Sequence, residues 1–418
     1  MLSSGYYFSL TYDLTLSKAK HLQKKPTETR FQWNHELYRD FIKFNIDQAW
    51  MVSLIQGHIG YFASTIASDR VDFFLISRRS CLNSGTRYYA RGKHLFQERM
   101  LRIISYIGLD DDANVANFVE TEQIFFFRDK CCSHVQVRGS APVFWRQKGI
   151  QAQIKLDRTF ALTNHLFLKH MQFLNETYGY VICINLMAKS KKEEQMITEA
   201  FETHIRANVL NETGYEYFDF HRHVGNQKFE NTNPLIDKLF PALDSLGFTI
   251  ENLQNGTLEL SQSGICILKQ DFSLETIIGV LRTNCLDCLD RTNFIQGKVG
   301  MAAFALGLER LGIALKDIIG REPYEELDNA NIKIQNSLIV NFKNLWADNG
   351  DALSIHYTGT GSVISEVTRL GKRSFFGLID HGLKTINRYY NGSFEDKLKQ
   401  DCLDFLLAKH AGAVTNSK

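Results

Sequence analysis

The segment from Thr276 to Leu306 constrains the fold more than any other part of the chain. It begins with the apolar run 276–281, which predicts a buried strand, and it ends with apolar side chains at helical spacing, at Ile295, Val299, Ala302, Ala303 and Leu306. Between them lies the sequence Arg282-Thr-Asn-Cys-Leu-Asp-Cys-Leu-Asp-Arg-Thr-Asn293. A loop between a buried strand and a helix lies at the carboxyl edge of a sheet, where α/β proteins bind their ligands.

The loop places a cysteine and an arginine six residues apart, Cys285 and Arg291, with Thr292 directly after the arginine. The first N–H groups of a helix have no partner within that helix and favour an anion, so a thiolate and a phosphate both fit there. Free cysteine has a pKa of about 8.5, and a fall of about two to three units makes the thiolate the main form at neutral pH. The pattern is typical of cysteine-based phosphoryl transfer.

We expect several polar residues of the loop to take part in that chemistry. Cys285 is predicted to attack phosphorus and form a phosphocysteine, Arg291 to hold two phosphate oxygens, and Thr292 to donate its hydroxyl to the sulfur. A leaving alkoxide needs a proton, which Asp287 or Asp290 can supply. We favour Asp287, because alternate loop positions tend to face a ligand. This route needs neither a metal ion nor a cofactor.

Polar residues outside the loop are candidates for binding the substrate. Asn284 and Asn293 flank the reacting residues, and Arg369, Lys372 and Arg373 form a later basic segment that can hold further phosphates or anionic headgroups. A solvated turn is an equally good interpretation of that basic segment. Other arginines are a similar pool of basic residues, of which part are expected to form structural ion pairs: Arg78, Arg79, Arg87, Arg91 and Arg138.

Three further features allow both a functional and a structural interpretation. Asp219 is a reserve candidate for the general acid, and His221 can carry a proton, although a structural histidine is the commoner case. Residues 346–351, Trp-Ala-Asp-Asn-Gly-Asp, are expected to form a loop that positions the catalytic loop or caps the next helix. Cys285 itself is alternatively a buried structural cysteine, or forms a redox pair or half a zinc site with Cys288.

Periodicity along the rest of the chain predicts an α/β fold with a mixed sheet flanked by helices. Alternation predicts a half-buried strand near residues 6–10 and core strands at 71–76, 135–139 and 181–186, and helical spacing is found at 36–50, 192–208, 235–246, 325–346 and 395–407. Strands that alternate with helices place the loop at Cys285 outside the carboxyl ends of the strands.

The loop sequence resembles the signature of the Sac-domain phosphoinositide phosphatases, and other blocks agree in order from about Gly5 to Leu407. They include Arg30-Phe-Gln-Trp-Asn34, Ser77-Arg-Arg-Ser80, Gly85-Thr-Arg-Tyr-Tyr-Ala-Arg-Gly92, Val115-Ala-Asn-Phe-Val-Glu-Thr-Glu-Gln123, Gln136-Val-Arg-Gly-Ser-Ala-Pro-Val-Phe-Trp145, Phe218-Asp-Phe-His221, Trp346-Ala-Asp-Asn-Gly350 and Thr368-Arg-Leu-Gly-Lys-Arg373. One departure is the stretch 93–109, where the family usually has only a few residues.

The resemblance implies a fold, an activity and a place of action. Residues 1–60 are expected to be a small, partial N-terminal lobe and residues 61–410 the catalytic domain that carries the Cys-x5-Arg phosphate loop. The implied substrates are phosphoinositide lipids at a membrane surface, such as phosphatidylinositol 4-phosphate, with the 3-phosphate as a further candidate. The implied location is cytoplasmic and peripheral, on the cytosolic face of the endoplasmic reticulum or Golgi, with an adaptor protein as a recruiting partner.

Composition agrees with this interpretation and excludes several others. At a net charge of +2, any attraction to anionic lipid must come from local clusters, and we expect no nucleic-acid partner. Eight cysteines in 418 residues do not form a disulfide framework, so we expect a reducing compartment. No apolar run reaches the roughly 18 residues that a membrane span requires. The amino terminus does not resemble a signal peptide.

Two other functions compete with a lipid phosphatase. Some Sac proteins act largely as scaffolds that organise lipid-kinase assemblies, and loss of the cysteine or the arginine would mark that use, but both are present here. A phosphotyrosine phosphatase shares the spacing of Cys285 and Arg291 but finds no support in the other blocks.

Overall fold

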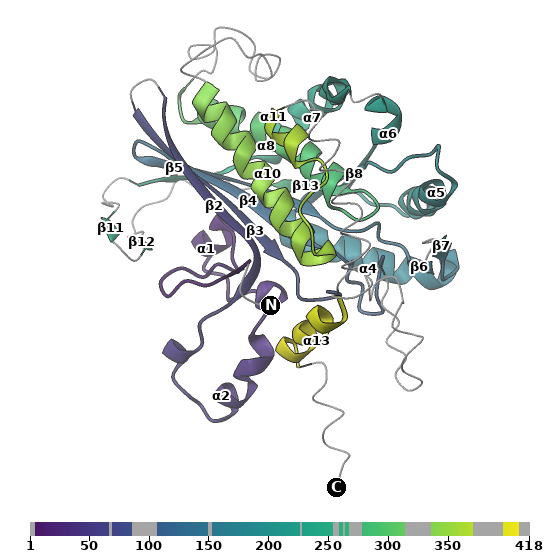
Figure 1. Ribbon diagram of the computed structural model, residues 1–418, viewed down its shortest axis with the longest axis horizontal. Coiled ribbons are helices and arrows are strands. Elements are labelled where there is room, and N and C mark those ends of the chain that lie inside the picture. Colours follow the sequence, from purple (N-terminus) through teal and green to yellow (C-terminus); the bar gives the residue numbers. More distant parts are fainter. Residues whose placement is uncertain are drawn as a thin grey trace.

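A single mixed β-sheet crosses the molecule and carries the loop that the sequence singles out (Figure 1). The computed structural model describes residues 5–66, 69–85, 107–148, 153–225, 228–253, 259–261, 264–266, 278–313, 336–370 and 396–408. Within them the sheet has nine strands in the order β1 (Tyr6–Tyr7), β2 (Ile55–Ile66), β3 (Asp69–Arg79), β4 (Val119–Phe127), β5 (Lys130–Arg138), β13 (Gly279–Asn284), β8 (Tyr180–Asn185) and β9 (Thr213–Tyr217), with β10 (Thr249–Asn252) paired to β5.

The direction of the strands changes from antiparallel to parallel within the sheet. The pairs from β1 to β5 are antiparallel, whereas β13 lies parallel to both β5 and β8, and β8 lies parallel to β9. Asn284 at the end of β13 is in register with Asn185 at the end of β8, and Thr283 with Arg138 at the end of β5. The carboxyl ends of three neighbouring strands therefore meet at one edge of the sheet.

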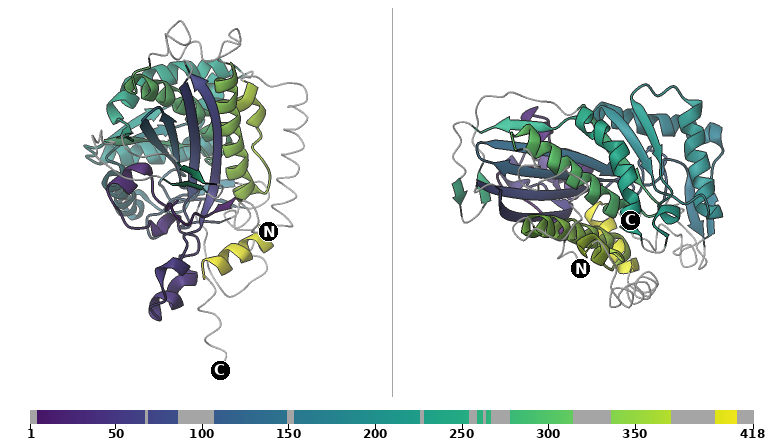
Figure 2. Two further views of the ribbon diagram at one scale, coloured as in Figure 1. Left: turned by 90° about the vertical axis from the view of Figure 1, so that its left-hand side faces the viewer. Right: turned by 90° about the horizontal axis from the view of Figure 1, so that it is seen from above.

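Helices cover both faces of the sheet (Figure 2). The helices α7 (Asn233–Leu246), α8 (Asp290–Arg310) and α10 (Asn336–Thr358) enclose one hydrophobic core, in which the ring of Phe304 lies 5.2 Å from Phe73 and 4.9 Å from Phe125, measured between centroids. The helices α4 (Phe160–Tyr178) and α5 (Lys192–Ala207) enclose a second core. This is the α/β arrangement that the sequence predicts.

Short elements complete the described structure. The remaining α-helices are α1 (Lys18–Leu22), α2 (Arg39–Lys43), α6 (Phe220–His223), α11 (Ser365–Leu370) and α13 (Asp396–Leu406), and two hairpins pair β6 (Trp145–Lys148) with β7 (Gln153–Leu156) and β11 (Glu259–Ser261) with β12 (Gly264–Cys266). In the described part of the chain, no helix combines the length and the apolar character needed to cross a bilayer.

Many of the predicted elements are present at the expected residues. The strands predicted at 71–76 and 181–186 are β3 and β8, and the helices predicted at 192–208, 235–246 and 395–407 are α5, α7 and α13. The helix predicted at 325–346 is present only as the start of α10, because residues 314–335 lie outside the described part of the chain. Residue 60, the expected domain boundary, lies inside β2, and the division into two domains stays a prediction.

Three local predictions are wrong. The strand near residues 6–10 stops at Tyr7, and Phe8 and Leu10 are 63% and 79% exposed. The helix predicted at 36–50 is broken into short helical turns, with Asn45 at φ +51° between them. Residues 346–351 lie in the middle of α10 instead of in a loop, because Trp346 and Asn349 are buried there against α8 and β3.

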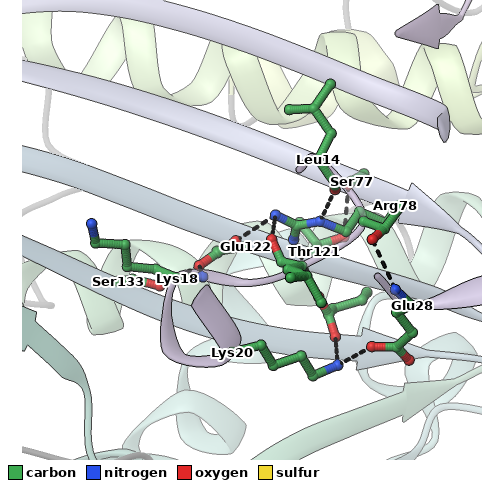
Figure 3. Close-up of polar contacts among 12 residues, drawn as sticks. Leu14, Lys18, Lys20, Glu28, Ser77, Arg78, Thr121, Glu122 and Ser133 are labelled. Carbon is green, nitrogen blue, oxygen red and sulfur yellow. Dashed lines mark hydrogen bonds and ion pairs between the residues drawn. The ribbon is translucent and has the colours of Figure 1, made fainter. Parts of the chain in front are cut away.

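A buried ion network fastens the N-terminal segment to the sheet (Figure 3). Arg78 on β3 is fully buried and donates to carboxylate oxygens of Glu120, at 3.2 Å, and Glu122, at 2.7 Å. Its other N–H groups donate to the carbonyl oxygens of Leu14 and Leu16, at 2.6 and 2.8 Å. Arg78 therefore forms structural ion pairs of the kind that we expected among the arginines. It also joins β3 directly to the segment before α1.

We predict that replacing Arg78 by methionine lowers the free energy of unfolding by about 3–5 kcal/mol, because the buried Glu122 loses the cation that it pairs with and the buried Glu120 keeps only Lys20, at 3.3 Å. Urea denaturation followed by circular dichroism measures the change. Lys238→Met is the matched control, since it removes an exposed cation whose partner is Glu216 and is expected to cost at most about 1 kcal/mol. Equal effects of the two substitutions would contradict the role given to the network.

Candidate functional site

The turn Cys285–Leu289 connects β13 to α8 at the edge where the parallel strands end. Its conformation is fixed from several sides: Cys288 has a positive φ of +53°, its thiol donates to the carbonyl oxygen of Cys285 at 3.4 Å, and the side chain of Asn117 donates to the carbonyl oxygen of Asp287 at 3.1 Å. Thr292 and Arg291 follow in the first turn of α8. The sheet thus presents the sulfur beside the amino-terminal end of a 21-residue helix.

Cys285 lies in a setting that stabilises its thiolate although it is only 3% exposed. The hydroxyl of Thr292 donates to its sulfur at 3.2 Å, as predicted. Burial by itself would raise the pKa of the thiol, but the hydrogen bond from Cys288, the positive charge of Arg291 and the hydroxyl of Thr292 outweigh burial and lower the pKa to about 6. The thiolate is therefore the main form at neutral pH.

Arg291 is held by a carboxylate from another part of the chain. Its two terminal nitrogens lie 2.8 and 3.2 Å from the two carboxylate oxygens of Glu194 in the first turn of α5, and one of them also contacts the carbonyl oxygen of Leu186 at 3.3 Å. Glu194 is 3% exposed and accepts a further hydrogen bond from the backbone N–H of Ala188 at 2.7 Å. A two-point contact of this kind sets the orientation of the planar guanidinium.

The two carboxylates of the turn have different surroundings. The negative charge of Asp287 raises the pKa of both Cys285 and Arg291, so its carboxylate lies near the sulfur and the guanidinium. Asp290 instead accepts hydrogen bonds from the hydroxyl of Ser362, at 2.6 Å, and the N–H of Val363, at 2.9 Å. These contacts join α8 to the segment after α10, which favours Asp287 over Asp290 as the proton donor.

Asn293 and Asn284 are buried and hydrogen-bonded to neighbouring residues, and the substrate contacts that we expected of them stay a prediction. The amide nitrogen of Asn293 donates to the carbonyl oxygen of Trp346 at 2.8 Å, and its oxygen accepts from Arg138 and Asn349 at 3.1 and 3.0 Å. A Cβ on Gly350 would lie 2.6 Å from the Asn293 amide nitrogen, so the small residue permits this approach. Asn284 is fully buried and donates to Asn185 at 2.9 Å.

Two buried arginines lie behind the turn without a carboxylate. Arg138 is 1% exposed and Arg282 is fully buried, and in the described part of the chain neither forms an ion pair with an aspartate or glutamate. Burial lowers the pKa of Arg138 to about 10, while the Cys288 and Cys285 sulfurs act in the opposite direction. Both guanidinium groups thus add positive potential at the place where an anion is expected.

The segment after β8 and the turn that leads to α6 form the rim of the site on the α5 side. Asp219 caps α6 by accepting from the N–H of Arg222 at 3.0 Å, and it also accepts from the N–H of Lys189 at 3.1 Å. His221 is exposed, and its Nε2 lies 3.1 Å from the Nζ of Lys191. Asp219 is therefore committed to holding these two segments together, which makes it a poor candidate for the general acid.

The later basic segment is only partly described. Arg369 lies on α11 and pairs with Asp348 at 2.7 Å and Asp351 at 3.3 Å, so it has a structural use. Lys372 and Arg373 lie outside the described residues, as do Arg87, Arg91 and most of the stretch 93–109.

Sequence reasoning missed Glu194, the carboxylate that holds Arg291. It lies 97 residues before its partner in the stretch Lys191-Lys-Glu-Glu194, which is typical of an exposed helix start. The helical period offered a signal: Ile197, Thr198 and Phe201 are buried on the same side of α5, which turns Glu194 inward and leaves Glu193 outside.

The chain is similar to proteins of one family. The profile of the SacI homology domain matches residues 1–94 and 101–225, which is more than half of the chain. An inositol-1,4,5-trisphosphate 5-phosphatase 1 of Schizosaccharomyces pombe is 33% identical over 436 residues, which covers 98% of this chain and 35% of that protein.

Two other relatives align over nearly the whole chain, and their alignments therefore include the turn at Cys285. The phosphatidylinositol-3-phosphatase SAC1-B of Danio rerio is 29% identical over 98% of this chain and 64% of its own length, and human synaptojanin-1 is 30% identical over 97% of this chain and 23% of its own. The chain thus spans between about a quarter and two thirds of the length of these relatives.

We predict that the rate at which Cys285 reacts with iodoacetamide rises with pH and is half-maximal near pH 6, because its thiol has a pKa of about 6. Mass spectrometry of quenched samples across the pH range measures the rate at this residue, and Cys285→Ser identifies the peptide signal. In Thr292→Val the midpoint is expected to rise by about one unit, since a hydrogen bond to a charged group contributes on the order of 1.5 kcal/mol. A wild-type midpoint near 8.5 would show an ordinary thiol.

Proposed function

The chain belongs to the SacI homology family, and on that premise we propose that it is a phosphoinositide phosphatase that removes a monoester phosphate from the inositol ring of a phosphatidylinositol phosphate. The observation that carries the proposal is the ionised Cys285 between β13 and α8, with Thr292 and Arg291 on the helix beside it. We assign the turn from Cys285 to Arg291 as the phosphate loop.

The proposed reaction has two steps on one residue. In the first, the Cys285 sulfur attacks phosphorus, a sulfur–phosphorus bond forms, and the bond from phosphorus to the ring oxygen breaks while the Asp287 carboxyl gives its proton to that oxygen. In the second, the Asp287 carboxylate takes a proton from water, the water oxygen bonds to phosphorus, and the thiolate leaves. Arg291 and the N–H groups of the loop hold the equatorial oxygens in both steps.

Glu194 is proposed as the positioning residue for Arg291. Phosphoryl transfer depends on donors that already point at the developing charge, and a long arginine side chain loses conformational freedom when it is fixed. The two-point contact with the buried Glu194 fixes it before the substrate arrives.

The names of the relatives support a phosphoinositide substrate, and the place of action is proposed from the family resemblance. A relative that is named a phosphatidylinositol-3-phosphatase supports a 3-phosphate, and we keep phosphatidylinositol 4-phosphate as the first candidate substrate. We propose action at the cytosolic face of endoplasmic reticulum or Golgi membranes, with recruitment by an adaptor protein. Lys372 and Arg373 remain proposed contacts to the substrate.

We predict that Cys285→Ser lowers the rate of phosphate release from short-chain phosphatidylinositol 4-phosphate at least about a thousandfold, because the serine hydroxyl is not ionised at neutral pH. Malachite green detection of phosphate, with the 3-, 4- and 5-phosphates compared, measures the activity and its preference. Addition of a chelator is expected to leave the wild-type rate unchanged, since the proposed steps use no metal ion.

Cys402→Ser is the matched control, because Cys402 lies on α13 and outside the proposed site. An active Cys285→Ser protein would contradict the phosphocysteine route. Rescue of a cellular phenotype by Cys285→Ser would favour the scaffold function instead, and release of phosphate only from phosphotyrosine peptides would point to a protein phosphatase.

We predict that Glu194→Gln lowers kcat about tenfold with a smaller change in KM, because the amide cannot accept from both guanidinium nitrogens and Arg291 is no longer fixed. Glu193→Gln, which changes the exposed neighbour on the same helix, is the control and is expected to behave like wild type.

The pH midpoint of the reaction of Cys285 with iodoacetamide distinguishes loss of the Arg291 position from general damage to the loop. Removing the Glu194 carboxylate takes a negative charge away from the site, which lowers the pKa of Cys285, while a less fixed Arg291 stabilises the thiolate less. The two effects oppose each other, so the midpoint should stay near pH 6. A midpoint that rises toward 9 would show that the loop itself had collapsed, and wild-type turnover in Glu194→Gln would exclude a positioning role.

A further inference from the structure

Basic side chains collect on the rim of the site beyond Arg291. Lys191 precedes α5, and His221 lies on α6, so the two come from segments that follow neighbouring parallel strands, β8 and β9. Both side chains are exposed, and the Nζ of Lys191 lies 3.1 Å from the Nε2 of His221. The rim therefore faces solvent with a cation and an imidazole in contact.

This rim is fastened to the proposed phosphate loop through contacts on each side. Arg291 contacts the carbonyl oxygen of Leu186, directly after β8, and the carboxylate of Glu194 in the first turn of α5. The N–H of Lys189, between β8 and α5, donates to Asp219 directly before α6. Arg291, Lys191 and His221 thus lie on one edge of the sheet, held by a common frame.

The carboxylates that act on His221 are turned into the protein. Glu194 and Asp219 are 3% and 6% exposed and accept hydrogen bonds from inside the protein, whereas Glu193, two residues after Lys191, is exposed. In the described residues, Lys191 forms no ion pair, and its Nζ contacts the imidazole of His221. Burial, together with the charges of Arg291 and Lys191, lowers the pKa of His221, while Glu194 and Asp219 raise it.

We propose that Lys191 and His221 form a second anion subsite, beside the phosphate loop, that binds a phosphoryl group of the substrate other than the one being removed. This proposal rests on the proposed function, because it names which part of a phosphoinositide the rim contacts. In a monophosphorylated lipid, the group is the phosphodiester that joins the inositol ring to glycerol. In a free inositol polyphosphate, the same subsite accepts a second ring phosphate.

Groups that contact a non-reacting part of the substrate, as proposed for Lys191 and His221, contribute to substrate binding and leave the rate of the chemical step unchanged. Lys191→Gln is expected to raise KM for short-chain phosphatidylinositol 4-phosphate and for inositol 1,4-bisphosphate by about fivefold, and Lys191→Gln with His221→Asn by about twentyfold, at unchanged kcat. Inositol 4-phosphate, which lacks a second phosphoryl group, is expected to give the same KM with both variants as with wild type. Phosphate release with each of the three compounds measures these constants.

Arg206→Gln is the matched control, since it removes one exposed cation from the far end of the same helix. Its KM values are expected to equal those of wild type. An equal rise in KM for inositol 4-phosphate would overturn the proposal, because the rim would then act on the reacting phosphate. A rise seen only with lipid vesicles, and absent with the short-chain lipid, would also overturn it and would assign Lys191 to contact with the membrane surface.

A binding measurement keeps the subsite separate from the reaction. Titration calorimetry of short-chain phosphatidylinositol 4-phosphate with Cys285→Ser, alone and combined with Lys191→Gln, needs no turnover. A Kd that is about fivefold weaker in the combined variant supports the subsite even if wild type releases no phosphate, and equal Kd values reject it. Absence of phosphate release from all three compounds by wild type would instead reject the proposed function.

Discussion

A buried negative sulfur is the constraint on which the described site depends. Cys285 is almost fully enclosed, and an enclosed thiolate is unfavourable unless donors and cations surround it. The chain meets this requirement with groups from several elements: the thiol of Cys288 in the turn, the hydroxyl of Thr292 on α8, and the charge of Arg291. Arg138, which is buried and has no carboxylate partner among the described residues, acts in the same direction.

The same constraint explains why so many polar groups around the turn contact one another. A turn that positions a sulfur within 3.2 Å of a hydroxyl must not move, and its neighbours are held by hydrogen bonds on every side. Asn293 connects α8 to α10 and to Arg138, while Asp290 connects the start of α8 to Ser362. Asn293 and Asp290 therefore fix the frame of the turn.

Part of the fold and of the site could be predicted because the relevant signals are local. Apolar periodicity located β3, β8, α5 and α7, and the six-residue spacing of Cys285 and Arg291 singled out the turn. The errors have physical causes as well. Phe8 and Leu10 alternate like a strand but pair with no strand in the described part of the chain, and residues 346–351 are polar like a loop but their buried members contact α8 and β3.

By itself, the sequence determined which residues can ionise, donate or pack, and the spacing that places a cysteine before a helix. Only the tertiary structure decided which of those groups meet. Glu194 reaches Arg291 across 97 residues, and Lys191 reaches His221 across 30, because β8 and β9 lie parallel to β13 and their carboxyl ends share one edge. Such contacts depend on strand order and register, which arise from the packing of the whole sheet and leave no periodic trace in the sequence.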